Sequence, residues 1–142
     1  KAWAVNTAQN SILYLNHTRT IYIACVGSSS CSSMTVIADH AHSMQAYFTA
    51  EQSFSNGQIH ATHMTEGSIS CVVPSACSGM EVYAEYMESL FVECDNDACA
   101  NMMVDVSNAN QAIFDCERCS QADIVAVNTQ SVDLRCSDIL SC

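Results

Sequence analysis

Cysteine is the residue type in this sequence whose number and spacing point most directly to chemistry. Ten cysteines occur among 142 residues, and cysteines can form disulfides, hold a soft metal ion or make a redox-active pair. They fall into five neighbouring pairs: Cys25 and Cys31, Cys71 and Cys77, Cys94 and Cys99, Cys116 and Cys119, and Cys136 and Cys142. We predict that all ten form disulfides, which places the chain in an oxidising compartment, outside the cell or on its surface.

Zinc binding and redox chemistry are the alternatives for one of these pairs. Cys116-Glu-Arg-Cys119 has the C-x₂-C spacing shared by zinc ligands and thioredoxin-type redox sites. No second pair with this spacing and no pair of histidines lies in register with it, and no βαβ pattern surrounds it. We therefore expect no metal, no cofactor and no catalytic residue at this pair.

Three histidines recur at a fixed step and are weak candidates for metal ligands. His17, His40 and His63 follow one another at intervals of 23 residues, and Asp39 adjoins the second of them. Imidazoles on neighbouring strands can bind a transition metal. In later units the same position holds an aromatic residue and two amides: Tyr86, Asn108 and Asn128. That continuation favours a ladder of stacked, hydrogen-bonded polar side chains at a turn.

Acidic residues suggest two further kinds of site. Asp95, Asn96 and Asp97 crowd one short segment, where their oxygen atoms could hold calcium. Paired carboxylates such as Asp105 and Asp123 could serve glycoside hydrolysis, which needs two of them at a set separation. Further acidic residues cluster in one neighbouring segment: Glu81, Glu85, Glu88 and Glu93. No glycine-rich calcium repeat accompanies any of them, so we expect a solvated acidic surface.

The spacing of the cysteine pairs reveals the repeat that must position these residues. The step from the end of one pair to the start of the next is 17 residues in three cases: Cys77 to Cys94, Cys99 to Cys116, and Cys119 to Cys136. The longer gap from Cys31 to Cys71 has room for one more unit, whose pair positions are occupied by Phe48 and Phe54. An earlier unit begins near Ala8. The chain is therefore about six copies of a unit of 20–23 residues.

Alignment of the units sorts apolar residues into columns. The reference position in each unit is the second cysteine of the pair, or the residue aligned with it. Five residues after this position stand Leu13, Val36, Ile59, Val82, Val104 and Ile124. Fifteen residues after it stand Ile23, Ala46, Ile69, Val92, Phe114 and Leu134. Apolar residues alternate with polar ones inside each unit, which predicts short strands with one buried face. Stacking of like columns predicts an all-β, right-handed parallel β-solenoid, a single domain over residues 1–142, with disulfides at its corners.

The phenylalanine pair also bears on how the cysteines are connected. Both cysteine positions are lost together in one coil, and two aromatic side chains can fill the same space. This favours disulfides within each coil. Pairing between coils, as in Cys71 with Cys94 and Cys77 with Cys99, stays open, because stacked strands also fall within disulfide distance.

Two units carry a resemblance to a known family: Cys71-Val-Val-Pro-Ser-Ala-Cys77-Ser-Gly-Met80-Glu-Val82 and Cys94-Asp-Asn-Asp-Ala-Cys99-Ala-Asn-Met102-Met-Val104. The chain resembles the right-handed parallel β-helix (pectin-lyase-like) superfamily, in particular the cysteine-rich repeats of protist and algal surface proteins. The resemblance holds at the level of the repeat. It implies a β-helix and an extracellular setting, and it carries over no catalytic residue.

Composition narrows the range of partners. Four basic residues against 15 acidic ones give a net charge of −11, which excludes nucleic acid and disfavours anionic glycans. No apolar stretch approaches the length of a membrane span. The sequon at Asn16 predicts N-glycosylation, in keeping with secretion.

Function follows from the repeat only in outline. Neither end of the repeat shows a capping element, so we expect either a segment of a longer solenoid or a protomer that stacks end to end into a filament or surface stalk. The alternative is a glycan-binding adhesin module that uses the aromatic residues Tyr14, Tyr83 and Phe91. A polysaccharide-active enzyme is the second alternative.

Overall fold

A computed structural model describes residues 2–5 and 9–137 of the chain. Every regular element among these residues is a β-strand. The strands are β1 (Ala2–Val5), β2 (Ile12–Asn16), β3 (Thr20–Cys25), β4 (Thr35–Asp39), β5 (Ser43–Phe48), β6 (Gln58–Cys71), β7 (Glu81–Cys94), β8 (Met103–Ser107), β9 (Gln111–Cys116), β10 (Asp123–Val127) and β11 (Ser131–Cys136). The predicted all-β class is confirmed.

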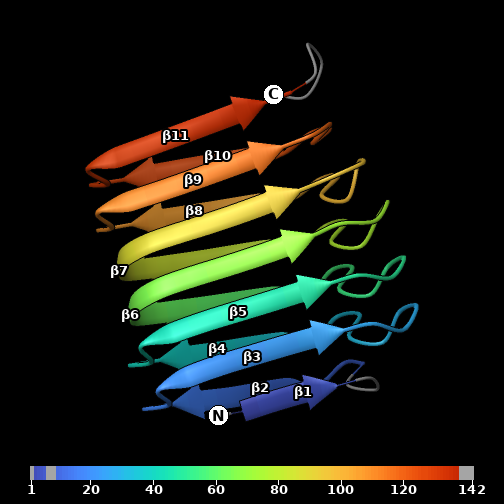
Figure 1. Ribbon diagram of the computed structural model, residues 1–142, viewed down its shortest axis with the longest axis horizontal. Helices are drawn as coiled ribbons and strands as arrows, with labels where there is room; N and C mark the ends of the chain where they lie inside the picture. Colours follow the sequence, from blue (N-terminus) through green and yellow to red (C-terminus); the bar gives the residue numbers. More distant parts are fainter. Residues whose placement is uncertain (1, 6–8, 138–142) are drawn as a thin grey trace.

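The strands wind into a parallel β-solenoid with two sheets (Figure 1). The rear sheet contains β2, β4, the first parts of β6 and β7, β8 and β10. The front sheet contains β1, β3, β5, the second parts of β6 and β7, β9 and β11. In Figure 1 front strands run to the right and rear strands to the left while the chain rises from β2 to β11, which is a right-handed winding.

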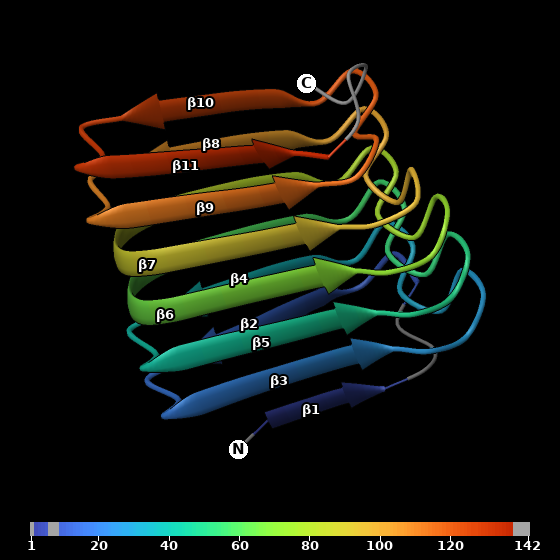
Figure 2. The same cartoon turned by 45° about the horizontal axis from the view of Figure 1, so that its top comes forward.

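Two kinds of connection alternate along the solenoid, and Figure 2 shows them on opposite edges. Rear strands pass to front strands through a tight turn, which takes three residues where the two strands are separate: 17–19, 40–42, 108–110 and 128–130. In β6 and β7 the strand continues through this turn. Front strands pass to rear strands through a wide corner of six to nine residues: 26–34, 49–57, 72–80, 95–102 and 117–122.

The register confirms the apolar columns. Val36 pairs with Leu13 on one side and Ile59 on the other, and Val92 of the front sheet lies between Ile69 and Phe114. The middle coils bury these side chains completely, or nearly so, between the two sheets. Each coil contributes only one strand to each sheet. Its apolar side chains are therefore buried by the neighbouring coils as well as by the opposite sheet.

Disulfides close the wide corners within single coils. Cys25 is bonded to Cys31, Cys71 to Cys77, Cys94 to Cys99 and Cys116 to Cys119, with Cα–Cα distances of 5.7–6.1 Å. The within-coil pairing is thus confirmed for these four, and pairing between coils is wrong for them. The predicted bond between Cys136 and Cys142 involves a residue outside the described part of the chain.

One wide corner is held by aromatic rings. Phe48 and Phe54 are fully buried and stack with ring centroids 4.3 Å apart, at the positions where neighbouring coils carry a disulfide. Gly57 accompanies them, at the position held by Met34 and Met80 in the adjacent coils. A Cβ at Gly57 would lie only 2.7 Å from Phe54 Cζ, so glycine makes the room that the ring requires.

Candidate functional site

The predicted histidine column lies along the tight-turn edge. We call its six residues the tight-turn ladder: His17, His40, His63, Tyr86, Asn108 and Asn128. All six have a φ between 52° and 54°, in the left-handed region, which asparagine and histidine adopt more readily than most residues. The backbone amide of His40 donates to the carbonyl of Thr62 in the next coil, and Asn108 donates likewise to Val127. These backbone hydrogen bonds fix the main-chain position from which each ladder side chain extends.

The side chains of the ladder stack along the solenoid. The ring centroids are 5.2 Å apart from His17 to His40, 4.6 Å from His40 to His63, and 5.1 Å from His63 to Tyr86. The last two pairs are nearly parallel, with interplanar angles of 18° and 11°. Asn128 then donates from Nδ2 to Asn108 Oδ1 at 3.3 Å. The chemistry of the ladder therefore changes from imidazoles to a phenol to amides.

Asp39 joins two of these histidines. Its Oδ2 lies 2.8 Å from Nδ1 of His40, and its Oδ1 lies 3.1 Å from Nδ1 of His63. Thr62 donates from Oγ1 to the same Oδ1 at 2.7 Å. The hydrogen bond from Thr62, followed by those from His40 and His63, holds the pKa of Asp39 well below its usual range. The carboxylate is therefore ionised throughout the neutral range and faces both imidazoles.

This cluster differs in part from the one expected from spacing. His40 and His63 come together with Asp39, whereas His17 stacks on the far side of His40. Thr62 was not among the sequence candidates. It follows Asp39 in register on the next strand, but the corresponding positions in the other coils hold unlike residues, so no repeated pattern identifies it.

The other metal candidates have different surroundings. Two groups of cysteines from neighbouring coils lie close enough to share an ion, but their sulfur atoms are joined in disulfides: Cys71, Cys77 and Cys99, and Cys94, Cys116 and Cys119. A disulfide sulfur is not a thiolate ligand. Within residues 9–137, the groups of side chains close enough to share an ion include neither Asp95 nor Asp97.

A shallow hollow of about 210 Å³ lies on the outer face of the rear sheet. Its lining includes His60, Thr62, Tyr83, Glu85 and Asp105. The rings of His60 and Tyr83 stack with centroids 4.8 Å apart. Two carboxylates thus stand beside an aromatic surface, although Asp123, the partner expected for Asp105, is not among the lining residues.

The phenol of Tyr83 is held in place by an acid. It donates to Glu81 Oε2 at 3.1 Å, and the same oxygen accepts a hydrogen bond from Gln58 Nε2 at 2.8 Å. Partial burial, followed by the hydrogen bond and charge of Glu81, raises the pKa of Tyr83. Because Glu81 is engaged in both contacts, it serves to position Tyr83.

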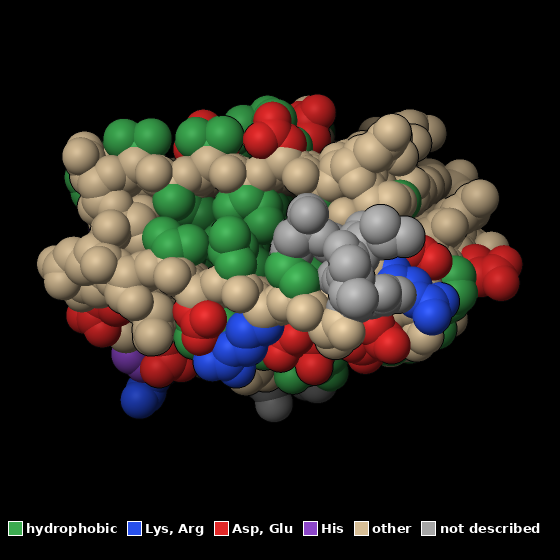
Figure 3. All heavy atoms as spheres, turned by 90° about the horizontal axis from the view of Figure 1, so that it is seen from above, with side chains coloured by type: hydrophobic (Ala, Val, Ile, Leu, Met, Phe, Trp, Pro, Cys, Tyr) green, Lys and Arg blue, Asp and Glu red, His purple; other side chains and the backbone are tan. Residues whose placement is uncertain are grey.

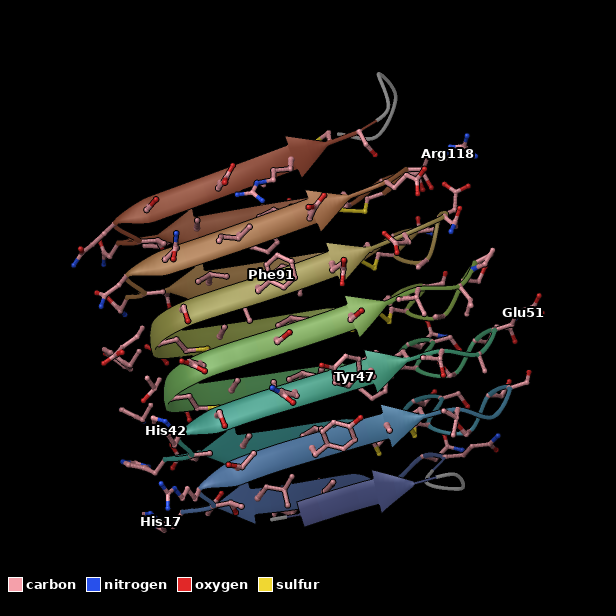
Figure 4. The ribbon with its side chains drawn as sticks, in the orientation of Figure 1. His17, His42, Tyr47, Glu51, Phe91 and Arg118 are labelled. Carbon is pink, nitrogen blue, oxygen red and sulfur yellow. A yellow bond between two sulfur atoms is a disulfide. The ribbon has the colours of Figure 1, made fainter. Side chains whose placement is uncertain are left out.

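The aromatic residues considered for glycan binding do not form one surface. Tyr14 is 66% exposed and shares its outward column with Tyr83, but two strands separate them. Phe91 lies on the front sheet, as Figure 4 shows, where it pairs with Ser68 and Ile113. A glycan contacting Tyr83 therefore cannot also contact Phe91 across the solenoid.

The last described coil exposes an apolar surface at the end of the solenoid. In β9 the inward-facing residues Ala112 and Phe114 are buried, whereas Val132 and Leu134, in register with them on β11, are 42% and 52% exposed. Seen from this end, apolar side chains occupy the visible part of the space between the two sheets (Figure 3). Among the described strands, β10 pairs only with β8 and β11 only with β9. Within the described residues, this end therefore presents the outer edges of β10 and β11 together with a cross-section of the core.

The chain matches no protein-family model, no curated protein and no solved structure. No helix in the described residues is long and apolar enough to cross a membrane. The functional conclusions therefore rest on the geometry of the fold and of its surface.

Proposed function

We propose that this chain is an extracellular structural protein, a β-solenoid rod that stacks end to end with further copies of itself. The observation that carries the proposal is the exposed core cross-section of the last described coil, with Val132 and Leu134 at 42% and 52% exposure. Burial of this apolar surface is favourable, and the outer edges of β10 and β11 offer backbone groups for parallel pairing with a second copy.

An extracellular location is part of this proposal. The four described disulfides are consistent with it, since such bonds persist in oxidising compartments. Asn16 ends β2 with its side chain exposed, where a glycan would meet no steric barrier from the core. Membership in the pectin-lyase-like superfamily, in its cysteine-rich repeat type, belongs to the same proposal and is supported by the parallel β-solenoid with corner disulfides.

Two lysine substitutions with equal starting exposure test the stacking. Val132 and Val125 are both 42% exposed, but Val132 is on the core side of β11 and Val125 is on the outer face of β10. We expect non-reduced protein to form end-to-end polymers in negative-stain microscopy and sedimentation velocity. Val132→Lys should abolish them and Val125→Lys should preserve them. A protein that stays monomeric at high concentration, or equal loss in both variants, would refute the proposal.

Glycan binding is the second candidate, favoured by the hollow beside the stacked rings of His60 and Tyr83. Aromatic rings bind the apolar faces of sugars, and the nearby carboxylates accept hydrogen bonds from hydroxyl groups. A glycan array probed with the Val132→Lys monomer should give signals that Tyr83→Ala removes. An array without signals would eliminate this candidate. Release of new reducing ends from a polysaccharide would identify the enzyme alternative.

A further inference from the structure

We propose that Asp39, His40 and His63 bind one divalent transition-metal ion, such as Zn²⁺ or Cu²⁺, on the tight-turn edge of the solenoid. Two imidazole nitrogens and a carboxylate are a ligand set that such ions prefer. This site is separate from the surfaces that would mediate stacking. A negative result for one proposal therefore does not affect the other.

The spacing of the three ligand atoms is close to that of a coordination sphere. Nδ1 of His40 and Nδ1 of His63 lie 2.8 and 3.1 Å from oxygens of Asp39, and the three ligand atoms all lie within 4.8 Å of one another. Bonds of 2.0–2.2 Å in a tetrahedral site separate ligand atoms by roughly 3.4 Å. The two imidazole nitrogens lie no more than 4.8 Å apart and would have to close to that separation around one carboxylate oxygen, which requires only small rotations of the two rings and of the carboxylate.

The surroundings hold the ligands in position. Thr62 donates to Asp39 Oδ1 at 2.7 Å, which orients the carboxylate. The ring of His17 lies against the outer side of His40 at an interplanar angle of 38°, and the ring of Tyr86 stacks on the outer side of His63 at 11°. Each ligand imidazole thus has an aromatic neighbour on its outer side, which restricts its rotation.

The site also leaves room for further ligands. The side chains of His40, His63 and Asp39 are 50%, 49% and 33% exposed. Water can therefore occupy the remaining coordination positions, as it does in zinc sites with three protein ligands. The net charge of −11 attracts a cation to the surface.

The backbone of the turn does not by itself require histidine. Asn108 and Asn128 adopt a φ of 53° at the equivalent positions, within a degree of His40 and His63. Asparagine is the more usual residue in this conformation. The turn thus accepts histidine, tyrosine and asparagine alike, so the three successive histidines point to a chemical role for the imidazoles. Among the six ladder residues, only His40 directly follows an aspartate.

Asparagine substitutions allow the site to be tested without disturbing the turn. Untagged, non-reduced protein should bind one Zn²⁺ per chain in isothermal titration calorimetry. His40→Asn, His63→Asn and Asp39→Asn should each weaken Zn²⁺ binding at least tenfold. His42→Asn is the control, because His42 is an exposed histidine at the same edge but outside the cluster, and it should leave the affinity unchanged. Far-UV circular dichroism should match the parent protein in every variant.

Electron paramagnetic resonance with Cu²⁺ as the probe identifies the ligands directly. The parent protein should show two coordinating nitrogens, and His63→Asn should show one. His17→Asn distinguishes this site from a ladder of three imidazoles: we expect less than a threefold change in affinity. The proposal is overturned if Zn²⁺ does not bind at micromolar concentrations, if His17→Asn weakens binding as much as His63→Asn does, or if Asp39→Asn has no effect.

Discussion

Gly57 gives the sharpest test of how the coil without a disulfide is packed. Adjacent coils carry Met34 and Met80 at this position, so Gly57→Met would restore the residue typical of the repeat. In the structure a Cβ on Gly57 would lie 2.7 Å from Phe54 Cζ, whereas ordinary contacts of a Cβ begin at 3.4 Å. Cδ1 of the same ring would be nearer, at 2.5 Å, so the Phe54 ring would have to move by at least about 0.9 Å for the Cβ alone, before the rest of the methionine is accommodated.

The cost of this change follows from the burial of the ring. Phe54 is fully buried and is stacked on Phe48, which is fully buried as well, so the displaced ring has no free space to enter. Overpacking of this kind costs up to about 3 kcal/mol. We therefore expect Gly57→Met to lower the free energy of unfolding by about 3 kcal/mol and Tm by roughly 10 °C. Guanidinium titration followed by circular dichroism measures both the folded fraction and the midpoint.

A compensating variant makes the prediction specific. Phe48→Cys and Phe54→Cys, combined with Gly57→Met, would give this coil the composition of its disulfide-bearing neighbours. In non-reducing buffer the triple variant should recover most of the stability lost in Gly57→Met, and reductant should remove that recovery. Glu51→Met, on the exposed part of the same corner, is the control and should be near neutral. A neutral Gly57→Met, or a triple variant less stable than Gly57→Met, would refute the reasoning.

Three further predictions concern the corners and the surface. Cys94→Ser with Cys99→Ser should cost about 2 kcal/mol, since the bond closes a short loop of sequence separation 5; a chemical denaturation curve measures the loss. Because the pKa of Tyr83 is raised above 10.0 by partial burial and Glu81, the unfolded chain releases this proton first, so stability should fall as the pH rises above 10.0; Tyr83→Phe should reduce that fall. Protein expressed through a secretory pathway should carry a glycan that enzymatic deglycosylation removes, and Asn16→Gln should lack it.

Spacing alone predicted the main features of the fold. Because identical columns must stack in a solenoid, the interval of 17 residues between cysteine pairs was sufficient to align the coils. The joint replacement of two cysteines by Phe48 and Phe54 then indicated that each disulfide lies within a coil. These inferences succeeded because each depends on residues that recur or are replaced together. The register and the four described disulfides agree with them.

The candidate site was less predictable because it depends on residues that occur once. The sequence places Asp39 beside His40, but only the geometry of the turn shows that Asp39 also reaches His63 and accepts a hydrogen bond from Thr62. The role of Gly57 was hidden for the same reason. A residue that differs from the repeat at one position can be interpreted only when the residue that it contacts is known, as Phe54 is for Gly57.

The unequal connections at the two edges bear on how such a chain can change its length. Every described coil uses a tight turn of fixed span, while the wide corners range from six to nine residues without altering the register of the strands. Insertions are therefore tolerated at the wide corners, where a disulfide or the Phe48–Phe54 stack closes the base of the loop. Segments grafted into successive wide corners would lie in a single line along the rod, with neighbouring segments one strand spacing apart. The tight-turn edge of the solenoid would stay unchanged.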